Sequence, residues 1–356
     1  MKWRWLVGGV LALGLLGALV LFGRALRHSE AYFHYPRPRA VKPADFAEAR
    51  EVTLRTPDGL ALRGWYVPSR NRAAVVMAHG LSQTRVALLP EARVLRDAGY
   101  GVLLFDLRAH GESEGATSTW GDKERLDVRV ALDFVRTQPE VDPERVGALG
   151  FSIGSAAVAE VAAQDPGVRA VVLLSPFNTL WLAAAYDFRR FGFVSQSGAL
   201  VPFWRRDIAL EEVRTIDAVE RIRPRSLLIV MGTEESGQPL ADELFAKVRE
   251  YAQTWRIQGA GHGDFSATEP LEYPRRLRAF LDAALLRGEG GRDEVPSGSA
   301  EGTRPPAPVA PRPRASPRAL RPHGRAADVR GGECPACAVT PEGAAAPSPP
   351  ASPAVP

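Results

Sequence analysis

The chain has 356 residues, a net charge of +4 and 45% hydrophobic residues, a composition typical of a globular protein with a sizeable core. Much of the basic excess lies near the two ends, so the charge says little about a substrate, and we expect no nucleic-acid partner. With only two cysteines in the chain, the folded body needs no disulfide.

The first notable segment, Trp5 to Gly23, is uncharged and long enough to cross a bilayer as one helix. A cleaved signal peptide has a shorter apolar core followed by a small-residue cleavage site, and the following sequence GRALRHSEA offers no convincing site. The sequence therefore predicts an uncleaved membrane anchor within residues 1–30, with the membrane contact made by residues 5–23. Basic residues flank both sides of the segment, so the orientation stays open.

Strand and helix patterns alternate through residues 40–287, which we predict to be one domain. Residues 50–56 and 60–67 predict a hairpin around Pro57-Asp58-Gly59. Helical spacing occurs in residues 88–99 and 123–138. Continuous apolar runs, typical of buried strands, occur at residues 73–80, 101–108, 145–152, 170–177, 226–232 and 254–262. Such alternation predicts an α/β fold, a mainly parallel sheet with helices on both faces.

Residues 178–225 are too many for a simple crossover between strands, and we predict an inserted helical lid there. Two aromatic-rich segments within it, residues 180–193 and 200–213, are expected to be helical. Insertions of this kind commonly cover a binding cleft, although extra packing gives the same pattern.

The C-terminal segment, residues 288–356, is rich in proline, alanine and arginine, and half of the 30 prolines in the chain lie after residue 290. Large apolar residues are scarce, so we predict a disordered tail. Its CxxC, Cys334 and Cys337, lacks the second ligand pair of a zinc site and the strand–helix setting of a redox site. We give it no role.

In a parallel sheet, functional side chains gather where strands end. Reading those ends in order yields His79-Gly80, Asp106, Ser152, Ser175, Glu234 with Glu235, and His262. Gly150, Ser152 and Gly154 form a G-x-S-x-G pattern between an apolar strand and a small-residue helix, which is typical of a sharp turn that exposes a nucleophilic serine. The glycines are expected because a side chain at either position would collide with the neighbouring strand or helix.

A serine nucleophile needs a base and an acid. Of six histidines, His262 follows the last strand between glycines and is the best base by position. The loop after residues 226–232 offers two acids, Glu235 and Glu234. Spacing favours Glu235, with Glu234 as the alternative.

These motifs together resemble the α/β-hydrolase fold family, in its serine esterase and prolyl-peptidase-like branch. The resemblance covers residues 51–286 and rests on AHG (78–80), DLRAHGESEG (106–115), GFSIGS (150–155), MGTEES (231–236) and GAGH (259–262). It implies an oxyanion hole formed by the backbone N–H groups of Leu81 and Ile153. It also implies a structural role for His79, and loop-shaping hydrogen bonds for Asp106, Arg108, His110, Gly111 and Ser113. The family usually has aspartate in the acid loop, and glutamate is a known alternative.

The leading hypothesis is a membrane-anchored serine hydrolase acting on a small-molecule ester or thioester, with no metal and no organic cofactor implied. Other hypotheses stay open. One is a non-catalytic scaffold on the same fold, and another is a peptidase or acyltransferase that uses the same triad. The sequence leaves the acyl specificity and the oligomeric state undetermined.

Overall fold

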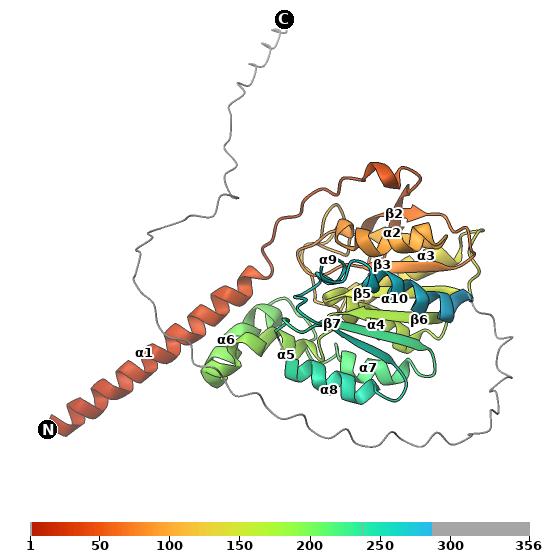
Figure 1. Cartoon of the computed structure of the whole chain (residues 1–356). Helices are drawn as coiled ribbons and strands as arrows, with labels where there is room; N and C mark the ends of the chain where they lie inside the picture. The colour runs from red at the N-terminus through yellow and green to blue at the C-terminus, as the bar shows by residue number, and fades with distance from the viewer. Residues whose placement is uncertain (1, 237, 287–356) are drawn as a thin grey trace, which may run out of the picture. The chain divides into compact units, whose positions relative to one another are not determined.

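A mixed eight-stranded sheet forms the centre of the protein in the computed structural model, which describes residues 2–236 and 238–286 (Figure 1). The strand order is β1-β2-β4-β3-β5-β6-β7-β8. β1 pairs antiparallel with β2, as the hairpin prediction requires, and β2 pairs antiparallel with β4, while all later pairs are parallel. The strands are β1 Arg50–Arg55, β2 Ala61–Val67, β3 Ala74–Ala78, β4 Gly101–Phe105, β5 Val146–Phe151, β6 Val168–Leu174, β7 Ser226–Gly232 and β8 Gln253–Ile257. The predicted fold class is confirmed.

Helices cover both faces of this sheet. On one face lie α3 Glu124–Arg136, α4 Ile153–Gln164, α7 Thr215–Arg221 and α8 Gln238–Val248. On the other lie α2 Leu89–Asp97, α9 Phe265–Thr268 and α10 Glu272–Leu281. Short helical turns occur at η1 Ala44–Phe46, η2 Arg85–Leu88 and η4 Asp282–Leu286. Successive strand residues such as Val75 and Val76 enter opposite cores and both are fully buried, which explains why the strands are apolar without alternation.

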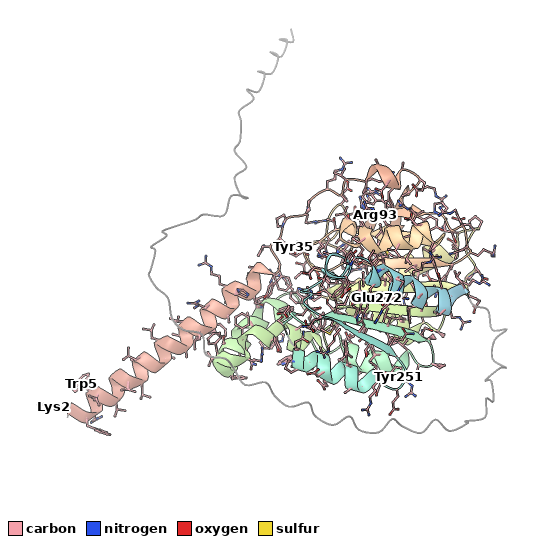
Figure 2. All side chains as sticks on the ribbon, in the orientation of Figure 1. Lys2, Trp5, Tyr35, Arg93, Tyr251 and Glu272 are labelled. Atoms are coloured by element: carbon pink, nitrogen blue, oxygen red, sulfur yellow. The ribbon has the colours of Figure 1, made fainter. Side chains whose placement is uncertain are left out.

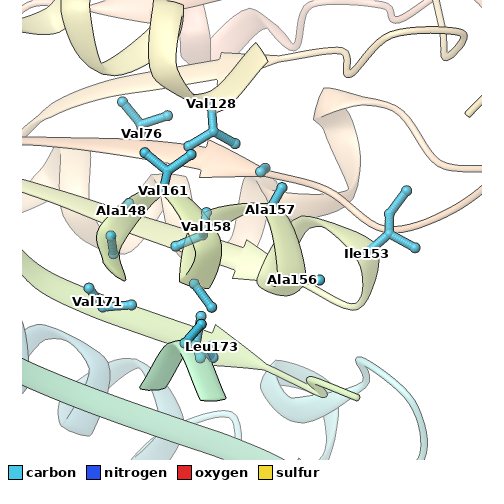
Figure 3. Packing of buried hydrophobic residues seen from close by; sticks show 14 of the residues in the cluster. Val76, Val128, Ala148, Ile153, Ala156, Ala157, Val158, Val161, Val171 and Leu173 are labelled. Atoms are coloured by element: carbon cyan, nitrogen blue, oxygen red, sulfur yellow. The ribbon is translucent and has the colours of Figure 1, made fainter. Parts of the chain in front are cut away.

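Helix α4 follows the turn at Ser152 and packs closely on the sheet. Its small residues, among them Ala156 and Ala157, are buried together with Val158 and Val161 beside Val76 (Figure 3). Burying one valine side chain stabilises the fold by about 1.5–3 kcal/mol. Because the start of α4 is held in the core, the turn that precedes it is held too.

The insertion contains α5 Leu180–Ala185, η3 Tyr186–Phe191 and α6 Gly192–Trp204. The helical prediction for residues 180–193 therefore matches α5 and η3, whereas the prediction for residues 200–213 is wrong beyond Trp204. Asp207 adopts a left-handed conformation with φ 52°, and Ile208 N–H donates to the carbonyl of Phe203. This is the hydrogen-bonding pattern of a helix C-terminus, and it stops α6 after Trp204.

The N-terminal helix α1, Lys2–Ala31, contains the predicted apolar segment and packs against α6. It is the one helix in residues 2–236 and 238–286 that is long and apolar enough to cross a membrane. Its first half is exposed, as at Trp5 (Figure 2). The predictions made for residues 288–356, including Cys334 and Cys337, fall outside the described residues.

Candidate active site

Ser152 lies in a strained turn between β5 and α4. Its φ of 52° and ψ of −115° are unusual for a residue with a side chain, and strain of this kind costs about 1–3 kcal/mol and clusters at functional sites. A Cβ on Gly150 would lie 2.3 Å from the carbonyl oxygen of Gly154, and a Cβ on Gly154 would lie 2.2 Å from that of Ala78. Both glycines of the motif are therefore required by close backbone packing, as expected.

The helix after this turn is held by Ser155. Its hydroxyl donates toward the carbonyls of Gly150 (2.7 Å) and Leu174 (2.8 Å), and Ser152 N–H donates to the same Leu174 carbonyl. These bonds join the turn to β5 and β6, so the position of the Ser152 hydroxyl is set by two core strands.

His262 and Glu235 meet where the loops after β8 and β7 converge. The imidazole Nδ1 of His262 donates to Oε2 of Glu235 at 2.8 Å. The carboxylate is 3% exposed, whereas the imidazole is 53% exposed. A buried carboxylate on Nδ1 orients the ring and leaves Nε2 free to exchange protons.

Two further hydrogen bonds hold the Glu235 carboxylate. Its Oε1 accepts from Ser175 Oγ at 2.9 Å and from Gly232 N–H at 2.6 Å. Glu234 is exposed, and its N–H bonds to the Ala260 carbonyl instead. Of the two acids left open by the sequence, the structure brings Glu235 to His262.

The two loops approach closely because Gly232 has no side chain. A Cβ there would lie 2.1 Å from the Ala260 carbonyl oxygen. This contact brings the end of β7 against the loop that carries His262, which lets the longer glutamate side chain reach the ring.

Ser152 and His262 line one cavity of about 460 Å³, although no hydrogen bond joins Ser152 Oγ to His262 Nε2 in the described residues. The cavity walls are more apolar than polar, as in most small-molecule sites. Its other lining residues include Tyr32, Leu81, Gln83, Trp120, Phe151, Ile153, Ser175, Phe177, Ala183, Tyr186, Met231, Glu235 and Leu240. The sequence did not single out Tyr32, which follows α1 directly and has no motif around it.

Leu81 and Ile153 line the same cavity, and the backbone N–H of neither donates a hydrogen bond to another described residue. The loop of Leu81 is held on both sides, since Gly80 N–H donates to Gln83 and Ser82 N–H donates to Nε2 of His110. Unpaired backbone N–H groups are the kind of donor that stabilises an oxyanion.

His79 is fully buried beneath this loop. Its Nδ1 donates to the Gly80 carbonyl at 2.8 Å, and its Nε2 accepts from Leu107 N–H at 3.1 Å. Burial lowers its pKa to about 3, so the ring is neutral. Both ring nitrogens are occupied, which agrees with the structural role implied by the resemblance.

The loop after β4 is also held by hydrogen bonds. His110 Nδ1 donates to the Arg108 carbonyl, and Ser113 Oγ donates to the Asp106 carbonyl. The Asp106 carboxylate accepts from the guanidinium of Arg85 and from its backbone N–H. Arg85 was missed by the sequence analysis, because a lone arginine in a loop gives no signal until its buried partner is known.

A metal centre has no obvious place in the described residues, where no group of three or more His, Cys, Asp or Glu side chains could hold an ion. The chemistry of the cavity is that of a serine, an imidazole, a carboxylate and two backbone donors. Such a set can transfer an acyl group.

Comparison with known proteins supports a hydrolase fold. A hydrolase family model described as serine aminopeptidase, S33, matches residues 69–205, a range that includes Ser152. The uncharacterized protein YfhR of Salmonella typhi is 31% identical over 273 residues, covering 71% of this chain and 88% of YfhR. The thiohydrolase AneE of Aspergillus aculeatus is 40% identical over 130 residues, 35% of this chain and 41% of AneE.

Among solved structures, an esterase of Pyrococcus furiosus superimposes with a TM-score of 0.59. The sequences are 24% identical, and the match covers 70% of this chain and 98% of the esterase. This likeness shows that the two chains share a fold.

Proposed function

Because this chain belongs to the α/β-hydrolase family, we propose that it is a membrane-anchored serine hydrolase that cleaves carboxylic esters or thioesters with Ser152, His262 and Glu235. The observation that carries the proposal is the Glu235–His262 hydrogen bond at a cavity that also contains the strained Ser152. A buried acid on one side of an imidazole and a solvent-accessible hydroxyl in the same cavity are the parts of a nucleophile and its base.

In the first half of the reaction, the Ser152 hydroxyl attacks the acyl carbonyl carbon while Nε2 of His262 takes its proton. The attack requires the two side chains to come within hydrogen-bonding distance in the substrate complex. The resulting oxyanion accepts hydrogen bonds from the N–H groups of Leu81 and Ile153. Glu235 stabilises the imidazolium. The tetrahedral intermediate then collapses, and His262 returns the proton to the departing alcohol or thiol.

In the second half, water attacks the acyl group on Ser152. His262 takes a proton from the water, and the same two N–H groups bind the new oxyanion. Collapse breaks the bond between the acyl carbon and Ser152 Oγ, the serine oxygen takes the proton held by His262, and the carboxylic acid is released. Each proton is passed through one imidazole, so these steps need no cofactor.

Three parts of the chain would have separate roles. Residues 1–30 would anchor the protein, residues 40–287 would form the catalytic domain, and the insertion at residues 178–225 would act as a lid, since its residues Ala183 and Tyr186 line the cavity. The likeness to a thiohydrolase supports thioesters as substrates. The matching family model is described as a serine aminopeptidase, so peptides are the competing substrates.

The experiment is fluorophosphonate labelling of the full chain in detergent, beside hydrolysis of p-nitrophenyl esters, a matched thioester and an aminoacyl p-nitroanilide. We expect labelling and ester or thioester hydrolysis in the wild type and neither in Ser152→Ala. Ser226→Ala, at the start of β7 and not among the residues that line the cavity, is the control for serine loss and should retain labelling. Wild-type protein that neither labels nor hydrolyses any substrate would overturn the enzyme proposal in favour of a scaffold. Preference for the anilide would make the protein a peptidase.

A further inference from the structure

Helix α6 packs on one face of α1, and this contact extends into the apolar segment of α1. Ala18 and Phe22 are partly buried, and Ala25 and Ser29 are fully buried, a spacing that places all four on one side of the helix. Gly198 of α6 lies so close that a Cβ there would be 2.5 Å from the Phe22 carbonyl oxygen. The two helices therefore pack backbone against backbone.

Polar and aromatic contacts secure the end of α1 to the same partner. Ser29 Oγ donates to the Ala199 carbonyl at 2.6 Å in a buried setting. Beyond it, Arg206 pairs with Glu30, and its guanidinium lies 4.2 Å from the ring centroid of Phe33. Small-residue packing, a hydrogen bond and an ion pair thus fix the position of α6 beside α1.

This packing sets the depth of α6 relative to a membrane. Ala18 and Phe22 belong to the uncharged segment that ends at Gly23, so a bilayer spanned by that segment would reach the level of α6. From Gly192 to Trp204, α6 has no charged residue. A helix without charge at this depth is suited to a lipid surrounding.

Several large apolar side chains of the insertion are exposed. Phe193 is 82% exposed, and Phe191, Trp181 and Trp204 are exposed as well. The two tryptophan rings lie 6.3 Å apart between centroids. Exposed aromatic clusters of this kind mark membrane or protein contacts, and tryptophan favours the bilayer interface.

Exposed arginines follow or flank the apolar segments of α1 and of the insertion in the sequence. Arg24 and Arg27 follow the apolar segment of α1, and Arg189 and Arg205 lie on the insertion, all four exposed. The Arg189 guanidinium stacks 3.5 Å from the ring centroid of Tyr186. Basic groups beside an apolar surface bind the phosphates of lipid headgroups. The charge and the apolar surface thus favour one occupant, the bilayer that α1 enters.

We propose that α5, η3 and α6 form a membrane-embedded element beside α1, and that the substrates of the cavity are esters or thioesters whose long acyl chain lies in the same bilayer. This inference rests on the proposed anchor and hydrolase. Tyr32 from the end of α1 and Ala183 and Tyr186 from the insertion line the cavity. An acyl chain leaving the lipid beside α6 would therefore meet the residues that line the cavity without crossing bulk water.

The depth of α6 is measured on the full chain in phosphatidylcholine and phosphatidylglycerol vesicles, with Cys334→Ser and Cys337→Ser as background. A single environment-sensitive label is placed by Phe193→Cys in α6, by Leu13→Cys in α1, or by Leu271→Cys. Leu271 is the matched control, since it is 85% exposed and apolar but lies before α10. Quenching by nitroxide lipids is compared with quenching by aqueous iodide.

We expect lipid quenching at Leu13→Cys and Phe193→Cys and iodide quenching at Leu271→Cys. If Phe193→Cys behaves like Leu271→Cys while Leu13→Cys is lipid-quenched, the embedded element is overturned and the anchor stands. If Leu13→Cys also behaves like Leu271→Cys, the anchor itself is overturned. None of these outcomes depends on catalysis.

Activity separates the substrate class from the hydrolase proposal. Phe193→Glu should lower hydrolysis of a long-chain ester held in vesicles by about tenfold or more, because an exposed phenyl group that binds lipid is replaced by a charge. Hydrolysis of soluble p-nitrophenyl acetate should be unchanged, as it should in Leu271→Glu with both substrates. Equal loss on both substrates, or no loss on either, would overturn the inference. A wild type that is inactive on both substrates and on a thioester, and that does not label with the fluorophosphonate, would overturn the hydrolase proposal.

Discussion

The carboxylate of Glu235 accepts a hydrogen bond from Nδ1 of His262 at 2.8 Å, although 27 residues separate the two in the chain. The acid is buried and the imidazole is half exposed, so the pair presents one free ring nitrogen to the cavity. If the proposed mechanism holds, replacing Glu235 should lower the rate more than replacing any other acid nearby.

Replacing Glu235 tests that dependence. Glu235→Gln keeps the size of the side chain but loses the charge that stabilises the imidazolium, so we expect kcat to fall about 10²- to 10⁴-fold. Glu234→Gln, one residue away and exposed, is the matched control and should retain wild-type kcat. The measurement is steady-state hydrolysis of a p-nitrophenyl ester. Equal effects of the two substitutions would contradict the assignment of the acid.

The glycines of the serine turn give a prediction on packing. Gly154→Ala puts a methyl group 2.2 Å from the Ala78 carbonyl oxygen, which must shift β3 or the start of α4. We expect a loss of about 1–3 kcal/mol of stability, as for other overpacked sites, and slower fluorophosphonate labelling. Gly14→Ala on α1, where an added Cβ meets nothing within 4 Å, should leave the labelling rate unchanged. Wild-type labelling in Gly154→Ala would refute the steric argument.

The buried His79 predicts an acid-sensitive fold. Its pKa is lowered to about 3 by burial, so between about pH 3 and the ordinary value of 6.5 the unfolded chain binds a proton that the folded chain does not. Stability therefore falls as pH drops through this range. The loss from this histidine is about 2 kcal/mol at pH 5.0.

His79→Gln provides the comparison, because an amide can also donate to the Gly80 carbonyl and accept from Leu107 N–H. Its stability should fall less than that of the wild type between pH 7.5 and 5.0, by about the same 2 kcal/mol. Urea unfolding of both proteins in one detergent measures the difference. Parallel pH curves would show that the ring is not held neutral.

The end of α6 predicts a stabilising substitution. Asp207 has φ 52° and its side chain forms no hydrogen bond with the described residues, so glycine should adopt this conformation at lower cost. We expect Asp207→Gly to be more stable than Asp207→Ala by about 1 kcal/mol, because alanine is disfavoured in left-handed conformations. Thermal unfolding of the two variants in detergent gives the order. Greater stability of Asp207→Ala would mean that residue 207 is not in this conformation.

The strands and the serine turn could be predicted from the sequence because their signals are local. A strand buried on both faces is an uninterrupted apolar run, as at β5 and β7, and the run survives in any arrangement of the other elements. The turn at Ser152 requires two glycines within five residues. The apolar composition of α1 is equally local, and its length alone makes it a membrane-spanning candidate.

Other features depend on residues far apart in the chain. Spacing favoured Glu235 over Glu234, but the close approach of Gly232 to Ala260, which brings the acid loop to His262, joins segments that are distant in the chain. The structural roles of Arg85 and Tyr32 likewise depend on partners tens of residues away. The sequence also predicted a helix beyond Trp204, because the residue type alone does not show that Asp207 adopts a left-handed conformation.

What the sequence determined by itself is therefore the kind of most elements and the residue types available for chemistry, since periodicity and glycine spacing act over a few residues. The tertiary structure decided which acid meets the imidazole, which N–H groups remain unpaired, and which helix covers α1. Those outcomes depend on close packing between segments that are far apart in the chain, as where Gly198 lets α6 approach the carbonyl of Phe22.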